Sequence, residues 1–424
     1  MKIISTFYIF FIPLFLLIFS YWSFACDIKN VRNKNHRQKN KSNNSQLYHV
    51  ELTYRSVKTK KCYASALIKH GLRHKSIRLS KRASIQELGA VNYANDVEWI
   101  CQISLGTPPQ SFLVAIDTAS ADLWIPSVYC NNCNNKRLYD DSQSSTIQYD
   151  NSDFSITYAD GSSSNGWIEW DTLQVGYIPI TSQQFAIIYG ISSAFQNDVI
   201  DGIMGLGYDS LSVYPGTQTP FTNMFNQNLI SKQIFSVQLR PARNNTNYGG
   251  IFVFGGIDTS LYKGSITYTP VTVQNFWQIG IDAVLYNGKA VTTSSKKQKQ
   301  QVIIDTATAL LILGTNVVKT LHTNMKGKLD STSQTWQVPC DLGSNVKVSI
   351  QINGVSLAIN YQDIVREKVS SKSTWCYSGI AATDSTTWIF GGVFMKNYYV
   401  IFDREKNQVG FATPFYPDQS NNSN

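Results

Sequence analysis

The sequence predicts a mainly β protein made of two similar lobes, and three observations support this prediction. The 424 residues exceed the usual size of one domain, and 43% hydrophobic against 15% charged residues suits well-filled globular cores. Short runs rich in Tyr, Phe, Val, Ile and Thr are separated by Gly and Asn, without a long amphipathic helical stretch. An apolar segment that carries an aspartate also occurs twice, which indicates a duplicated lobe.

Residues 1–25 have the layout of a signal peptide. Lys2 precedes an apolar run that ends at Phe19, and Ser23 and Ala25 stand at the spacing that a signal peptidase reads. We expect cleavage after Ala25 and therefore entry into the secretory pathway. An uncleaved membrane anchor is the alternative interpretation, because the apolar run is almost long enough to span a bilayer.

The positive charge of the chain lies in one N-terminal segment. Residues 27–82 contain 16 Lys and Arg against 2 Asp and Glu, whereas residues 83–424 contain 20 against 26. A disordered linker is one interpretation. The opposite charges of the two parts favour a basic propeptide, assigned to residues 26–88, whose cations cover an acidic site until nearby carboxylates are protonated. We expect no nucleic-acid partner, since the segment lacks interleaved aromatic residues, and no stable membrane association after signal cleavage.

Seven cysteines are present, which suits a secreted chain with disulfides and leaves at least one thiol free or bonded to another molecule. We expect a short local disulfide between Cys130 and Cys133, and Cys340 with Cys376 can close a longer loop. Zinc is the alternative for the CxxC pair, but no His lies nearby and no second CxxC exists. We therefore expect no metal and no other cofactor.

The internal repeat concerns two segments of fourteen residues. Residues 114–127 read VAIDTASADLWIPS and residues 302–315 read VIIDTATALLILGT, with seven identical positions in an ungapped alignment. Each copy is followed downstream by an apolar element with glycines, IMGLG at residues 203–207 and WIFGG at residues 388–392. A glycine after a buried strand lets another backbone cross at close range. We infer that each lobe supplies half of one site.

Each repeat places an aspartate, Asp117 or Asp305, at the end of an apolar strand. A buried carboxylate needs hydrogen bonds, and the hydroxyls that follow can donate them; a role limited to bracing a turn is the alternative. Two carboxyls brought face to face share a proton and titrate in two steps. A water held between them can lose a proton to the ionised carboxylate while the other carboxyl protonates a peptide carbonyl oxygen.

Six segments, in the same order along residues 92–413, resemble the pepsin family. They read YANDVEWICQISLGTPPQSFLVAIDTASADLWIPS, FSITYADGSSSNG, DGIMGLGY, FGGID, VIIDTATALL and WIFGGVFMKNYYVIFDREKNQVGFA. The resemblance implies two pseudo-symmetric β-barrel-like lobes around a central cleft, at residues 89–268 and 269–417, before a disordered tail at 418–424. It also implies a zymogen that becomes an endopeptidase acting on extended peptides, monomeric, and secreted or held in a lysosome-like vesicle.

The resemblance also assigns roles to single residues. It makes Asp117 and Asp305 the catalytic pair, and Tyr158 the tyrosine of a hairpin flap that includes Asp160 and Gly161. The supporting roles fall to Ser120 and Thr308 as outer hydroxyls that orient the carboxylates, Thr118 and Thr306 as the lock between the loops, and Trp124 as the hydrogen-bond partner of the flap tyrosine. Asp160 resembles an acidic flap residue of fungal pepsins that accept Lys before the scissile bond.

The sequence departs from the family pattern at the residue two positions after each aspartate. The usual motif is Asp-Thr/Ser-Gly, whereas Ala119 and Ala307 stand in place of both glycines. Glycine permits unusual dihedral angles and close backbone approach. The interpretation as an active aspartic endopeptidase therefore has an alternative, a catalytically weak or inactive pepsin-like protein that binds peptides.

Overall fold

The computed structural model describes residues 86–93, 96–242, 249–291 and 299–416. The predicted signal peptide, nearly all of the predicted propeptide and the predicted C-terminal tail lie outside the described residues. The predicted junction between propeptide and first lobe falls inside strand β1 (Gln86–Tyr93), and the predicted junction between the lobes falls inside strand β11 (Tyr262–Val273). Within the described residues, no helix is both long and apolar enough to cross a membrane.

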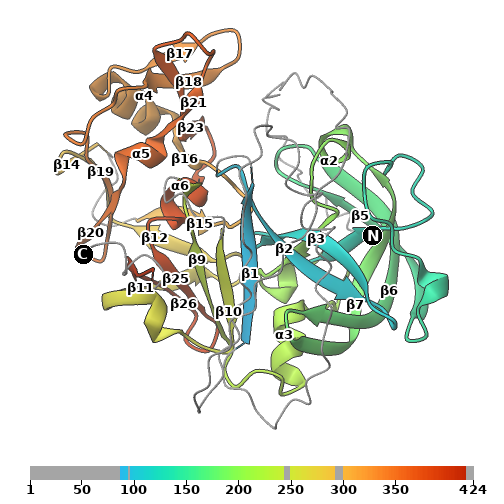
Figure 1. Cartoon of the computed structure of the whole chain (residues 1–424). Coiled ribbons are helices and arrows are strands. Elements are labelled where there is room, and N and C mark those ends of the chain that lie inside the picture. Colours follow the sequence, from blue (N-terminus) through green and yellow to red (C-terminus); the bar gives the residue numbers. More distant parts are fainter. Residues whose placement is uncertain (1–85, 94–95, 243–248, 292–298, 417–424) are drawn as a thin grey trace, which may run out of the picture.

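Six antiparallel strands of a larger sheet run through the middle of the molecule, and β1, β10 and β9 lie side by side there in Figure 1. Their order is β1–β10–β9–β25–β26–β11. The strands are β1 (Gln86–Tyr93), β10 (Gly250–Phe254), β9 (Ile234–Leu239), β25 (Tyr399–Asp403), β26 (Gln408–Pro414) and β11 (Tyr262–Val273). Strands from both ends of the chain thus join the two lobes, and the predicted mainly β, bilobal fold is confirmed.

The first lobe continues from β1 and lies on the green side of Figure 1. Its strands are β2 (Glu98–Leu105), β3 (Gln110–Asp117), β4 (Leu123–Pro126), β5 (Gln148–Thr157), β6 (Ser163–Val175), β7 (Ile178–Ile191) and β8 (Gly202–Gly205). Its short helices are η1 (Asp141–Gln143), α2 (Ser193–Gln196), η2 (Asp209–Leu211) and α3 (Pro220–Asn226). Strands β5, β6 and β7 form a long antiparallel unit, and β5 and β6 are joined as a hairpin.

The second lobe begins where β11 changes partner from β26 to β12. Its main strands are β12 (Gln278–Ile281), β15 (Gln300–Ile304), β16 (Leu311–Gly314), β23 (Ile380–Thr383) and β24 (Thr387–Phe390). Two small sheets are added by β13 (Ala283–Tyr286), β14 (Lys289–Ala290), β19 (Val348–Ile352) and β20 (Val355–Ile359), and by β17 (Lys328–Asp330), β18 (Thr335–Pro339), β21 (Val365–Lys368) and β22 (Trp375–Ser378). The remaining helices are η4 (Thr259–Leu261), α4 (Thr315–Asn324), α5 (Tyr361–Ile364) and α6 (Gly392–Met395).

The sequence repeat corresponds to a repeated structural unit. In the first lobe β3 runs parallel to β8, and β4 pairs antiparallel to β8. In the second lobe β15 runs parallel to β24, and β16 pairs antiparallel to β24. Each carboxylate segment therefore leaves a buried strand, turns and passes back beside the same partner strand.

The downstream glycines permit this crossing, as the sequence predicted. A Cβ on Gly205 would lie 2.4 Å from the carbonyl carbon of Ala121, and one on Gly391 would lie 2.0 Å from the carbonyl oxygen of Thr308. Both distances are shorter than any tolerated contact with backbone. Glycine at these positions is thus a steric requirement of the two loops.

Covalent and ionic links add to the packed core. The structure contains the disulfides Cys130–Cys133 and Cys340–Cys376, while Cys101 is buried and reduced. A buried ion group joins the lobes: Lys396 lies 2.6 Å from Asp96, which follows β1, and 3.2 Å from Asp363 in α5. Each of the two buried carboxylates is thus paired with the same ammonium group, which offsets part of the cost of burying them.

Candidate active site

The two aspartates of the repeat occupy equivalent positions in the two lobes. Asp117 is the last residue of β3, and Asp305 follows β15 directly. Their side chains are nearly buried, with exposed fractions of 4% and 6%. The strands that lead to them are apolar on their buried faces. Packing of each strand in the core therefore places its carboxyl in the interior.

Local donors hold both carboxyls. Asp117 accepts from the backbone N–H of Ala119 at 2.8 Å and from the Ser120 hydroxyl. Asp305 accepts from the backbone N–H of Ala307 at 2.8 Å, and from the N–H and hydroxyl of Thr308 at 3.2 and 2.6 Å. The hydroxyls that sequence reasoning selected thus lie beside the carboxylates. The sequence did not reveal that Asp305 has one more donor than Asp117.

Two threonines connect the loops across the lobes. The Thr118 hydroxyl donates to the carbonyl of Ile304 at 2.8 Å and accepts from the N–H of Thr306 at 3.1 Å. The Thr306 hydroxyl makes the reciprocal contacts with the carbonyl of Ile116 and the N–H of Thr118. This reciprocal network is buried and sets the separation of the two aspartate loops.

The carboxyl groups of Asp117 and Asp305 interact directly, and their pKa values reflect this. Burial, followed by the negative charge of Asp305, raises the pKa of Asp117 to about 7. Burial also raises the pKa of Asp305, but its donors from Thr308 and Ala307 oppose the rise. The pair therefore retains one proton over a broad acidic range.

The β5–β6 hairpin places Tyr158 near this pair. The Tyr158 hydroxyl accepts a 2.7 Å hydrogen bond from the Trp124 indole N–H, and Phe195 packs edge-on against both rings. Burial and the charge of Asp117 raise the pKa of Tyr158, so its hydroxyl stays protonated. The predicted contact between Trp124 and Tyr158 is thus present, whereas no sequence motif indicated the contact with Phe195.

The tip of the hairpin is a tight turn. Gly161 has a left-handed backbone with φ of +83°, and its N–H donates to the carbonyl of Tyr158 at 2.9 Å. Asp160 is exposed, and its carboxylate accepts from the N–H and hydroxyl of Ser162 at 2.9 and 2.6 Å. Asp160 therefore shapes the turn in addition to placing a negative charge at its tip.

The two alanines of the aspartate loops fit without a left-handed backbone. Neither Ala119 nor Ala307 is among the described non-glycine residues that have positive φ. Ala119 is partly exposed and Ala307 is exposed, so their methyl groups do not have to fit into the core. The backbone N–H of each still reaches its carboxylate, as a glycine N–H would.

One further buried carboxyl lies near the flap and was missed from sequence. Asp122 is 3% exposed and accepts from the Ser212 hydroxyl at 2.6 Å and the Val213 N–H at 3.1 Å. Burial raises its pKa, and its charge acts on Tyr158. Asp122 stands where the second repeat has Leu310, and this difference between the copies was the available signal.

A comparison with protein families agrees with this geometry. The family model of the eukaryotic aspartyl protease matches residues 98–414. The chain belongs to the eukaryotic aspartyl protease family. The described part of this aspartyl protease holds no group of three or more His, Cys, Asp or Glu placed to bind a metal ion.

Individual relatives cover most of this aspartyl protease. It is 34% identical to rhizopuspepsin of Rhizopus chinensis over 332 residues, 78% of this chain and 82% of the relative. It is 36% identical to pepsin A of Canis lupus familiaris over 330 residues, 75% of this chain and 81% of the relative. With pepsin A of Callithrix jacchus it shares 32% identity over 386 residues, 86% of this chain and 95% of the relative.

Proposed function

We propose that this aspartyl protease is an active endopeptidase that hydrolyses peptide bonds with a water activated between Asp117 and Asp305. The observation that carries the proposal is the pair of buried, interacting carboxyls whose pKa values are both raised. Such a pair holds one proton between two oxygen-rich groups, which is the state that acid–base attack by water needs.

The geometry suggests which carboxyl does which step. Asp305, with three local donors, is the better stabilised anion and accepts a proton from the attacking water. Asp117 holds the shared proton and donates it to the carbonyl oxygen of the scissile peptide bond. The water oxygen then bonds to the carbonyl carbon. Collapse of the resulting diol breaks the C–N bond as the nitrogen takes the proton from Asp305 and Asp117 takes a proton from a diol hydroxyl, which restores the starting state of the pair.

We further propose that the chain is made as a secreted or vesicular zymogen. The signal-peptide layout of residues 1–25 and the basic character of residues 27–82 support this proposal. The first lobe, the second lobe and the short tail would follow a propeptide that binds the acidic remainder of the chain. Extended peptides or proteins would be its substrates, and we expect a monomer.

Acid activation of the purified full chain tests the proposed function. We expect mass spectrometry to show loss of about the first 80 residues on acidification. Cleavage of an internally quenched peptide should appear at the same time and be blocked by pepstatin, a transition-state analogue. Pepstatin binding without any cleavage would refute the proposed activity and favour an inactive peptide-binding protein.

The double variant Ala119→Gly, Ala307→Gly measures how much the two alanines change kcat/KM. Because neither alanine has a left-handed backbone, we expect kcat/KM to change by less than about tenfold. A gain of several hundredfold would show that the methyl groups displace the attacking water. That result would make the natural chain a weak enzyme or a peptide-binding protein.

We also propose that Asp160 lets the enzyme accept Lys before the scissile bond while large apolar residues remain preferred. Peptide-library profiles of the wild type, Asp160→Asn and Asp160→Ala separate charge from turn geometry. The asparagine keeps an acceptor for Ser162 but removes the charge. Loss of Lys acceptance in both variants is expected, and equal acceptance in all three proteins would refute the idea.

A further inference from the structure

A cavity lies in the first lobe, beside strands β5, β6 and β7. Its volume is about 460 Å³, and it is lined by Tyr129, Asp141, Tyr149, Asn151, Trp167, Glu169 and Ile187. Along β6, Ile168 belongs to the apolar cluster that contains Trp124, whereas Trp167 and Glu169 are its neighbours in the strand. Successive side chains of a strand point to opposite faces of the sheet. The cavity therefore lies on the opposite face of the sheet from Tyr158 and Trp124.

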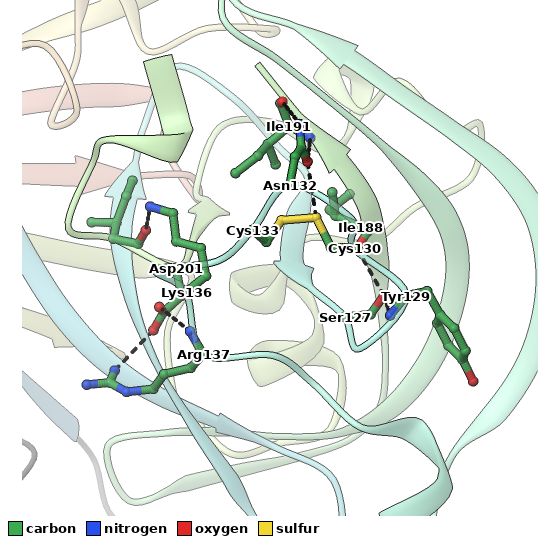
Figure 2. Close-up of a disulfide and its surroundings, with 11 residues drawn as sticks. Ser127, Tyr129, Cys130, Asn132, Cys133, Lys136, Arg137, Ile188, Ile191 and Asp201 are labelled. Atoms are coloured by element: carbon green, nitrogen blue, oxygen red, sulfur yellow. Dashed lines mark hydrogen bonds and ion pairs between the residues drawn. A yellow bond between two sulfur atoms is a disulfide. The ribbon is translucent and has the colours of Figure 1, made fainter. Parts of the chain in front are cut away.

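Aromatic rings form one wall of the cavity. Tyr129 packs edge-on to Trp167 at a centroid distance of 6.1 Å, and the centroid of the Tyr189 ring lies 4.7 Å from that of Trp167. Tyr129, Tyr149 and Tyr189 are 47%, 56% and 36% exposed, unlike core aromatics. In Figure 2 the Tyr129 ring points away from the Cys130–Cys133 disulfide, which anchors its loop.

The carboxylates of Asp141 and Glu169 also line the cavity. Glu169 is only 1% exposed; its Oε2 accepts from the N–H of Asp150 at 2.8 Å, while its Oε1 has no hydrogen-bond partner among the described residues. Asp141 accepts a 2.9 Å hydrogen bond from the Tyr129 hydroxyl. A buried carboxylate oxygen that lacks a partner is costly.

The pKa of Glu169 agrees with this arrangement. Burial raises it most, and the charges of Asp141 and Asp150 add to the rise, while hydrogen bonds from the backbone of Asp150 and Asn151 oppose it. The residues that line the described cavity include no Lys or Arg to offset these negative charges. A cation that entered the cavity would supply the missing charge and the missing donor together.

We propose that this cavity binds a Lys or Arg side chain of a basic peptide segment. The exposed ring of Tyr149 and the half-buried ring of Trp167 are available to the cation, and Glu169 pairs with it. The site is separate from the aspartate pair and does not depend on turnover. The basic segment at residues 27–82 is one source of such a side chain, and a separate peptide is another.

The position of β1 allows the chain's own basic segment, residues 27–82, to reach the cavity. A Cβ on Gly176, in the turn after β6, would lie 2.7 Å from the carbonyl oxygen of Glu87, so the start of β1 touches this turn. The turn lies at the end of the strand that carries Glu169, about 20 Å away at the usual rise per residue of a strand. The 85 residues that precede β1 are long enough to cover this distance.

Calorimetry on the full chain tests the site. The probes are the peptide acetyl-Gly-Ser-Lys-Ser-Gly-amide and the same peptide with norleucine in place of Lys, which keeps the shape of the side chain but removes its charge. We expect the Lys peptide to bind at least about tenfold more tightly than the norleucine peptide. The variants Glu169→Gln and Tyr149→Ala should each weaken binding of the Lys peptide by about tenfold.

Two control variants guard against unspecific effects. Tyr177→Ala removes an exposed tyrosine outside the cavity, and Asp341→Asn removes an exposed carboxylate of the second lobe; neither should change the affinity. Unchanged thermal unfolding of Tyr149→Ala, whose side chain is more than half exposed, would show that lost binding is not lost folding. Equal binding of both peptides, or unchanged binding in Glu169→Gln and Tyr149→Ala, would overturn the proposal.

A photo-crosslinking amino acid at Val128, which is 45% exposed next to Tyr129, distinguishes the two sources of the cation. A crosslink to residues 27–82 of the same chain, displaced by the Lys peptide, would assign the site to the chain's own basic segment. A crosslink to the added Lys peptide alone would assign it to a separate peptide. The absence of both crosslinks, together with no binding of the Lys peptide in calorimetry, would refute the site.

Discussion

The loops of Asp117 and Asp305 share one backbone plan but surround their carboxyls differently. Asp305 accepts from three local donors and Asp117 from two. On the side of Asp117 there is also a second buried carboxyl, that of Asp122, and the charges of both act on the flap tyrosine Tyr158. The duplication thus accounts for the symmetric geometry, while the two copies differ in the hydrogen-bond donors and charges around their carboxyls.

Removing either carboxyl is expected to have the largest effect. Asp117→Asn and Asp305→Asn should each lower kcat/KM on a quenched peptide by at least about 10³-fold, because water attack needs both an acid and a base. Circular dichroism and thermal unfolding of the variants serve as folding controls. A large loss in only one of them would show that a single carboxylate suffices and would break the proposed division of roles.

Substitutions at Gly205 and Gly391, which lie against the loops of Asp117 and Asp305, test whether the two loops are equally constrained. Gly205→Ala and Gly391→Ala should each lower the free energy of unfolding by about 3 kcal/mol or more, because the new methyl group meets backbone atoms in both lobes. Urea unfolding measures the loss. Gly190→Ala is the matched control, since a methyl group at that position would meet no heavy atom within 4 Å. A loss below about 1 kcal/mol in one lobe alone would show that its loop can move aside.

The raised pKa of Asp117 predicts a pH-dependent stability. A carboxyl with a raised pKa binds its proton more tightly in the folded state, so folding loses stability as pH rises from the ordinary value of 3.8 towards about 7. Over this range the wild type should lose about 2–4 kcal/mol more than Asp117→Asn. Chemical unfolding at pH 4 and pH 7 gives the difference, and parallel pH dependence of the two proteins would contradict it.

The flap contact should have the smallest effect of these changes. Trp124→Phe removes the hydrogen bond to Tyr158 but keeps an aromatic ring next to Phe195. We expect kcat/KM to fall by about tenfold, in line with one lost hydrogen bond. Tyr158→Phe removes the same hydrogen bond from the other side, so a much larger loss there would mean that the Tyr158 hydroxyl also contacts substrate.

Much of the site was predictable because its chemistry lies in short local motifs. Each copy of the repeat, around Asp117 or Asp305, includes its own apolar strand and hydroxyl residues. The glycines that leave room for each loop follow downstream of both copies. The helix α4 was not expected, because its Thr, Asn and Val residues have weak helix propensity; packing of Val318 and Leu321 into the core supports it instead.

The features that sequence reasoning missed depend on contacts between distant segments. The donors of Asp122 come from residues 212 and 213, and the cavity around Glu169 combines a loop, η1 and three strands. No local pattern marks such residues, since an isolated Tyr or Glu is typical of any surface. The different hydrogen-bond donors of Asp117 and Asp305 likewise became visible only in the folded chain.

The pH dependence of kcat/KM for the acid-treated chain tests most directly whether the two carboxyls act as a pair that shares one proton. A pair with one shared proton predicts a bell-shaped profile. Activity should fall at low pH, when both carboxyls are protonated, and at high pH, when Asp117 ionises with a pKa of about 7. A profile with a single limb, or one that stays flat from about pH 5 to pH 9, would contradict the shared proton and with it the proposed mechanism.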